Sequence, residues 1–187
     1  MESAPKHRTA EDFAEGLSDV LASPTESGSL QEIFIRPSED KRRQVATAEL
    51  TVEGGITGDR WADDHWQKLP DGSSDPISQV SVMNARILKL IAGEERAMGL
   101  AGDNLIVDLD LSEKNFPAGS QLQIGESVVI EFTSQPHTGC RKFALRYGQA
   151  AKEFINGSVG KPLNLRGRYA RILSSGTIQQ GDLVKKV

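Results

Sequence analysis

The sequence is poor in cysteine and has no long apolar run. Its only cysteine, Cys140, cannot form a disulfide within the chain, and a lone thiol is typical of the reducing cytoplasm. No apolar stretch is long enough to cross a bilayer, so we expect no membrane partner. The charged N-terminal residues Met1–Arg8 lead into an amphipathic stretch, which argues against a signal peptide. These features predict a cytoplasmic protein.

An excess of positive charge is also missing. The net charge of -4 argues against a general nucleic-acid binder, so we expect no nucleic-acid partner. The 187 residues suffice for one domain with a substantial core, and a hydrophobic content of 37% is ordinary for a globular protein. We find no internal repeat or low-complexity tract that would indicate another organisation.

Short strands dominate the predicted secondary structure. Helices are expected where Thr9 and Asn84 provide N-caps, and as a pair after Cys140. Many short strands with few helices predict a mainly β fold, a closed or nearly closed β-barrel with a few peripheral short helices. The expected strands cover residues 30–36, 45–52, 77–82, 105–107, 121–124, 128–133, 168–173 and 182–187.

The N-terminal segment is distinct from the strands. Residues 9–21 carry one apolar stripe, and the turn-forming segment Ser23–Gly28 ends the helix that this stripe predicts. We therefore divide the chain into an N-terminal helical arm over residues 1–28 and a β-barrel domain over residues 29–187. The arm either packs on the domain or forms a mobile tail.

Cys140 is the first candidate for chemistry, because a thiolate is both a good nucleophile and a soft metal ligand. Arg141 and Lys142 follow it and His137 precedes it by three residues, a basic flank that favours the thiolate. The alternative is a buried structural cysteine. A structural zinc site is not expected, since the chain has three histidines and no second cysteine.

The segment Gly55–Arg60 is the second candidate. Its glycines permit a tight turn that exposes backbone N–H groups, and Arg60, next to Asp59, can grip a phosphate or carboxylate. An ordinary turn with a solvated Asp–Arg pair is the alternative. The glycine spacing matches neither a Walker loop nor a dinucleotide fingerprint.

Two further groups of polar residues are weaker candidates. The segment Asp63–His65 has donors for a hard metal ion, but three polar residues in a loop are usually only solvated. Arg168 and Arg171 are three positions apart in a predicted strand, so they are expected on opposite faces. At most one of them can point to a given site at the end of the barrel.

The order of these motifs resembles the MOSC domain, the family named after the C-terminal domain of molybdenum-cofactor sulfurase. The resemblance covers roughly residues 30–187 and rests on the order and spacing of the motifs around one cysteine. The matching segments are Gly55–Arg60, Gly102–Leu105, Pro117–Gly119 with Leu122–Gly125, Cys140, Gly167–Ile172 and Gly176–Asp182.

The resemblance implies a β-barrel-like MOSC fold and a molybdenum cofactor (molybdopterin). It implies that Cys140 is the molybdenum ligand or a thiol that carries sulfur. Pyridoxal phosphate is not expected. With the basic flank of Cys140 included, the expected cofactor-binding residues are Arg60, Asp59, Asn104, His137, Arg141, Lys142 and Arg168.

Three functions follow from this resemblance and from the lone thiol. The first is reduction of small N-hydroxylated compounds, as in relatives of the family, with electrons from a separate electron-donor protein, since no ferredoxin-like cysteine set is present. The second is a sulfur carrier or sulfurtransferase, in which a cysteine desulfurase loads a persulfide on Cys140. The third is a non-catalytic domain that binds a small anion or a protein.

Overall fold

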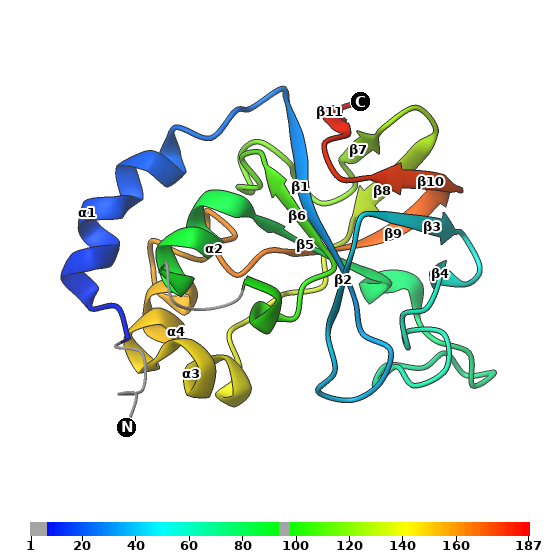
Figure 1. Ribbon diagram of the computed structural model, residues 1–187, viewed down its shortest axis with the longest axis horizontal. Helices are drawn as coiled ribbons and strands as arrows, with labels where there is room; N and C mark the ends of the chain where they lie inside the picture. Colours follow the sequence, from blue (N-terminus) through cyan, green and yellow to red (C-terminus); the bar gives the residue numbers. More distant parts are fainter. Residues whose placement is uncertain (1–6, 94–97) are drawn as a thin grey trace.

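A computed structural model describes residues 7–93 and 98–187, and its centre is a closed β-barrel. Within these residues seven strands pair in the order β11-β7-β8-β9-β5-β6-β1, and β1 pairs again with β11 to close the ring (Figure 1). The predicted mainly β fold is confirmed. The strands are β1 (Ser27–Ile35), β5 (Val80–Asn84), β6 (Leu105–Asp108), β7 (Gln121–Ile124), β8 (Val128–Phe132), β9 (Arg168–Ser174) and β11 (Leu183–Lys186).

A small sheet lies beside the barrel, opposite the helices (Figure 1). It has the order β10-β3-β4, with β10 at Gly176–Gln179, β3 at Thr47–Thr51 and β4 at Gly55–Ile56. β2 (Arg43–Val45) pairs with the end of β1, so the strand expected over residues 45–52 is divided in two. β10 has no clear sequence signal, because Ile178 is the only buried residue in this short strand.

The barrel strands alternate between two apolar cores. Val80 and Val82 of β5 point into the barrel, whereas Met83 belongs to a second core under the helices. β9 follows the same alternation, with Arg168 buried and Arg171 exposed. The opposite faces that their spacing predicted are therefore confirmed.

The helices gather on one side of the barrel (Figure 1). Thr9 caps α1 in a capping box with Asp12, and Phe13 of α1 is fully buried and stacks on Phe154 with ring centroids 5.0 Å apart. Of the two alternatives for the arm, its helix packs on the domain; residues 1–6 lie outside the described residues. The helices are α1 (Ala10–Leu21), α2 (Ala85–Ala92), α3 (Arg141–Tyr147) and α4 (Gln149–Asn156), with 3-10 turns at Pro76–Ser78 and Met98–Ala101.

Among residues 7–93 and 98–187, no helix is both long enough and apolar enough to span a bilayer.

Candidate functional site

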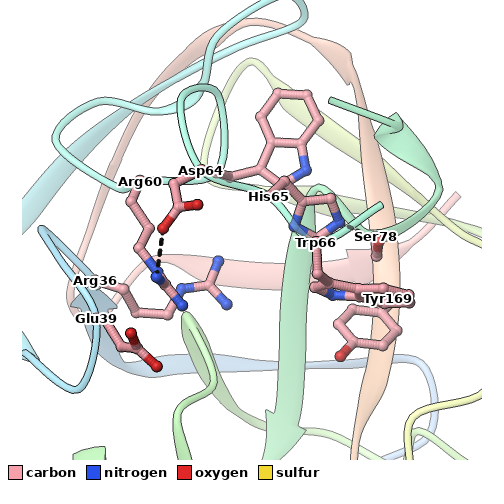
Figure 2. A pocket seen from close by; sticks show the side chains of 9 residues that line it. Arg36, Glu39, Arg60, Asp64, His65, Trp66, Ser78 and Tyr169 are labelled. Carbon is pink, nitrogen blue, oxygen red and sulfur yellow. Dashed lines mark hydrogen bonds and ion pairs between the residues drawn. The ribbon is translucent and has the colours of Figure 1, made fainter. Parts of the chain in front are cut away.

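Two adjoining clefts open near Cys140 and share the side chains of Arg36, Trp66 and Tyr169. The first, which we call the Cys140 cleft, has a volume of about 360 Å³. The second, the Arg60 cleft, has a volume of about 280 Å³ and is drawn in Figure 2. Besides the shared residues, the Cys140 cleft is lined by side chains that include Arg42, His137, Cys140, Lys142, Arg146 and Arg166.

Cys140 is exposed at the N-cap of α3. Hydrogen bonds to Gly139, the residue before Cys140, fix the position of the thiol. The Gly139 N–H donates to Asn156 Oδ1 at 2.8 Å, and Asn156 Nδ2 donates to the Gly139 carbonyl at 3.0 Å. Asn156 is the last residue of α4, so this helix holds the loop that carries the thiol. A buried structural cysteine, the alternative that the sequence left open, is not what the structure shows.

Asp59 is buried and holds Arg36 at the boundary between the clefts. Its two oxygens accept from Arg36 Nε and Nη2, both at 2.9 Å, and they also accept from the backbone N–H groups of Arg36 and Trp61. Burial acts to raise the pKa of Asp59, but the hydrogen bonds and charge of Arg36 outweigh it and the pKa is lowered. Asp59 thus positions a cation that lines both clefts.

Asn104 is completely buried and links three parts of the fold. Its amide nitrogen donates to Asp59 Oδ2 at 2.9 Å and to the Phe34 carbonyl at 3.2 Å. Its amide oxygen accepts from the N–H and the hydroxyl of Ser81. These four hydrogen bonds engage both polar atoms of the side chain, and the bond to Asp59 helps to hold the Asp59–Arg36 pair in place.

The Arg60 cleft combines charged and aromatic walls. Figure 2 shows Arg36, Glu39 and Arg60 on one side and His65, Trp66 and Tyr169 on the other. Arg60 Nη1 lies 2.8 Å from Asp64 Oδ2. This ion pair uses one of the Arg60 donors that were expected to bind an anionic ligand, and it leaves the guanidinium at the cleft.

The hard-metal candidate over residues 63–65 does not form a cluster. Asp64 pairs with Arg60, and His65 Nε2 shares a hydrogen bond of 2.8 Å with the Ser78 hydroxyl. In the part of the chain that the structure describes, no three His, Cys, Asp or Glu side chains are grouped to hold a metal ion. Burial, with the charges of Arg36 and Lys68, lowers the pKa of His65 to about 4.

His137 forms the inner wall of the Cys140 cleft. Its ring stacks on Tyr169 with centroids 4.2 Å apart, and its Nδ1 lies 3.6 Å from Asp103 Oδ1. Asp103 is fully buried and accepts from Arg166 Nη1 at 2.6 Å. Burial, together with the charges of Arg166 and Arg36, holds the pKa of His137 well below its ordinary value.

The basic flank of Cys140 points in two directions. Lys142 lines the cleft, where its Nζ bonds Asp40 at 3.0 and 3.1 Å and Glu39 at 3.2 Å. Arg146, one turn further along α3, also bonds Asp40 at 3.2 Å. Arg141 is exposed. The loop between β1 and β2 therefore supplies carboxylates to two cations of the cleft.

Arg168 is bound inside the barrel end. Its guanidinium donates to the Phe116 carbonyl, packs over the Phe132 ring and lies 3.5 Å from a Glu113 oxygen. Its neighbour Tyr169 is the residue of β9 that lines both clefts. The alternation of the strand, which sends successive side chains to opposite faces, explains this difference.

Several residues of the clefts were missed from the sequence. Arg36 ends a predicted strand, and Arg42 lies in the loop that follows it. The motif Gly102–Leu105 was the one available signal for Asp103. Gly102, at φ 90°, also lies where an added Cβ would come within 3.2 Å of Arg42 Nη2, so the glycine gives room to this guanidinium.

Comparison with known proteins assigns the family. A model of the MOSC domain matches residues 67–185. The chain belongs to the MOSC domain family. No curated protein sequence matches the chain. YuaD from Bacillus subtilis, a solved structure, is 15% identical and has a TM-score of 0.59 over 86% of this chain and 95% of its own.

Two solved YiiM proteins are also similar to this MOSC domain. YiiM from Geobacillus stearothermophilus is 17% identical, with a TM-score of 0.53 over 88% of this chain and 74% of its own. YiiM from Escherichia coli is 18% identical, with a TM-score of 0.54 over 85% of this chain and 69% of its own. At these identities the likeness shows the shared fold, which agrees with the MOSC-like barrel expected from the sequence.

Proposed function

We propose that this MOSC domain binds a molybdenum cofactor in the Cys140 cleft, with the Cys140 thiolate as the protein ligand of the metal, and reduces N-hydroxylated compounds. MOSC domains are in general associated with molybdenum cofactor binding. The observation that carries the proposal is an exposed thiol in a cleft whose charged lining residues are cations, namely Arg36, Arg42, Lys142, Arg146 and Arg166. Soft thiolate suits the metal, and the cations suit the phosphate of a molybdopterin.

Buried donors in the cleft fit an anionic ligand. Arg42 Nε and Arg166 Nε are buried and have no hydrogen-bond partner among the described residues. Both residues line the Cys140 cleft. Burial, followed by repulsion from Arg146 and Arg36, lowers the pKa of Arg42, so its neighbouring cations as well as its burial oppose its charge. A bound phosphate would accept from these N–H groups and offset the repulsion.

The protein's part in the reaction is to bind and orient. Cys140 would hold the metal, while Arg42 and Arg166, with Lys142 at the mouth, would hold the cofactor's anionic end. The bound cofactor would supply two-electron chemistry. Reduction of an N-hydroxyl group takes two electrons and two protons and releases the amine and water, and a separate donor protein would provide the electrons.

Metal analysis tests this proposal. The protein is purified from a host that makes molybdopterin and from one that does not, and molybdenum is measured per chain. We expect molybdenum only in the first preparation, and far less in Cys140→Ser. Since the thiol is exposed, this variant should keep the wild-type Tm. Absence of molybdenum from both wild-type preparations would overturn the proposal.

A second candidate function is a sulfur carrier, and the exposure of Cys140 favours it, because a thiol open to solvent is open to another protein. A cysteine desulfurase would transfer one sulfur atom to Cys140 as a persulfide. Intact mass after incubation with the desulfurase and cysteine tests this candidate. An adduct of one sulfur atom, absent in Cys140→Ser, supports it, and an unchanged mass rejects it. If the protein binds no molybdenum and acquires no sulfur, the third candidate function is non-catalytic binding of a small anion or a protein.

A further inference from the structure

His137 and Asp103 face each other through one ring nitrogen and one carboxylate oxygen. His137 Nδ1 lies 3.6 Å from Asp103 Oδ1, and both atoms are buried without a hydrogen bond among the described residues. The side chains are 8% and 0% exposed. Both atoms are closed to solvent, which leaves the two side chains facing each other directly. A small adjustment of the imidazole ring closes a direct hydrogen bond.

Both members of this pair are held in place from other elements. Arg166 Nη1 donates to Asp103 Oδ2 at 2.6 Å, and Arg166 Nη2 donates to the Ala101 carbonyl at 3.0 Å. Tyr169 of β9 stacks on the His137 ring at an interplanar angle of 29°. The ring plane and the carboxylate are therefore fixed before any ligand enters.

The charges around the pair determine which nitrogen carries the hydrogen. Burial, with Arg166 and Arg36 nearby, keeps His137 neutral, and a neutral imidazole has one N–H and one lone pair. Burial raises the pKa of Asp103, but its loss of charge would leave the buried Arg166 guanidinium unpaired, so the carboxylate stays ionised. An ionised carboxylate only accepts, which places the hydrogen on Nδ1 and leaves the lone pair on Nε2.

We propose that Asp103 and His137 act as a fixed pair that makes His137 Nε2 a hydrogen-bond acceptor in the Cys140 cleft, where it receives the hydroxyl hydrogen of an N-hydroxylated ligand. The ligand class rests on the proposed function; the hydrogen-bond geometry of the pair does not. The guanidinium groups of this cleft only donate, so an acceptor among them selects a ligand that carries a donor. Asp103 acts through His137 and is a positioning residue.

The tautomer is tested by NMR of the metal-free protein. Long-range ¹⁵N–¹H spectra of the imidazole groups distinguish a protonated ring nitrogen from one with a lone pair. We expect the hydrogen on Nδ1 of His137 in the wild type. In Asp103→Asn, Arg166 should take the single amide oxygen and the amide N–H should face Nδ1, so the hydrogen should move to Nε2. A hydrogen on Nε2 in the wild type overturns the proposal, even if the Asp103 variant does not fold.

The ligand contact is tested with benzamidoxime and its O-methyl ether, which lacks the hydroxyl donor. Binding is followed by the His137 ring resonances, or by those of Tyr169 in the variant. O-methylation should weaken binding to the wild type by about threefold to tenfold, the worth of one hydrogen bond. His137→Phe keeps a ring on Tyr169 without an acceptor, so it should lose this difference. His65→Gln, in the adjoining cleft, should keep it.

Two results count against the contact. One is an equal effect of O-methylation in the wild type and His137→Phe, and the other is a set of His137 resonances that neither probe shifts. These readouts need no molybdenum. Molybdenum uptake with the hydrogen on Nε2 would support the proposed function and reject the His137–Asp103 pair. No molybdenum uptake with the hydrogen on Nδ1 would reject the proposed function and support the pair.

Discussion

Arg36 Nε and Nη2 donate to the two carboxylate oxygens of Asp59, both at 2.9 Å, across 23 positions of the chain. Asp59 also accepts from the buried amide of Asn104. Asp59 and Asn104 were expected to contact the cofactor. Instead, Asn104 supports Asp59, and Asp59 positions Arg36, which lines both clefts. A bidentate pair fixes the plane of a guanidinium as well as its position, and this determines where an anion can be gripped.

The Arg36–Asp59 pair predicts a large effect of Asp59→Asn. The substitution keeps the shape but removes the charge that pairs with Arg36, so we expect a loss of about 2 to 4 kcal/mol in the free energy of unfolding. Urea unfolding at neutral pH measures it. Asp63→Asn, an exposed aspartate of the following loop, serves as the control and should change little. Equal midpoints for the two variants would contradict this role of Asp59.

His65 predicts a dependence of stability on pH. Its pKa is about 4 in the folded protein and near the ordinary 6.5 in the unfolded chain, since burial and the charges of Arg36 and Lys68 oppose protonation, although Asp75 and Asp59 act the other way. Between these values the unfolded state binds more protons, so stability falls as the pH falls. The lowered pKa of His137 also makes stability fall as the pH falls.

His65→Gln should therefore reduce, without abolishing, the slope of the unfolding free energy against pH between about pH 4 and pH 6.5. An unchanged slope in urea unfolding would show that His65 titrates normally.

Asp40 predicts an effect on anion affinity. It binds Lys142 and Arg146, both in the wall of the Cys140 cleft, so Asp40→Asn should strengthen phosphate binding at low salt. Because Asp40 and Lys142 are half-exposed, we expect only about a twofold to fivefold change that fades at high salt. Asp40 has a φ of 55°, and asparagine tolerates this left-handed conformation, so the backbone should not change.

Calorimetric titration with inorganic phosphate measures this affinity. Asp71→Asn is the matched control, since this exposed aspartate bonds Ser73 and lies outside both clefts as they are lined here. The same phosphate affinity in Asp40→Asn and Asp71→Asn would mean that Asp40 does not compete for the cations.

The sequence predicted the strands and helices better than it predicted the long-range side-chain contacts. Strand alternation and N-caps act over a few residues, so most barrel strands and the helix after Asn84 could be located from the sequence. The strand expected over residues 77–82 is displaced: Pro76–Ser78 form a 3-10 turn, and β5 covers Val80–Asn84. The site depends instead on pairings such as Arg166 with Asp103, which are 63 positions apart and follow no periodic pattern. Asn104 and Arg168 lay in matched motifs, but only the folded chain shows that their polar groups bond to other parts of the protein.

Asn156 predicts how firmly the thiol loop is held. Its amide bonds both the N–H and the carbonyl of Gly139, and Asn156→Leu removes both hydrogen bonds while keeping a side chain of similar size. The loop should then open more often, with hydrogen exchange at the Gly139 amide faster by about tenfold or more. Gln149→Leu, which removes an exposed side-chain bond to Glu153 on the same helix, should leave this rate unchanged. Equal exchange rates in the two variants would show that α4 does not hold Cys140 in place.

The same two variants should differ in molybdenum content when they are made in a host that makes molybdopterin. The Asn156 variant should hold less molybdenum than the Gln149 variant, because a metal ligand on a mobile loop loses more entropy on binding.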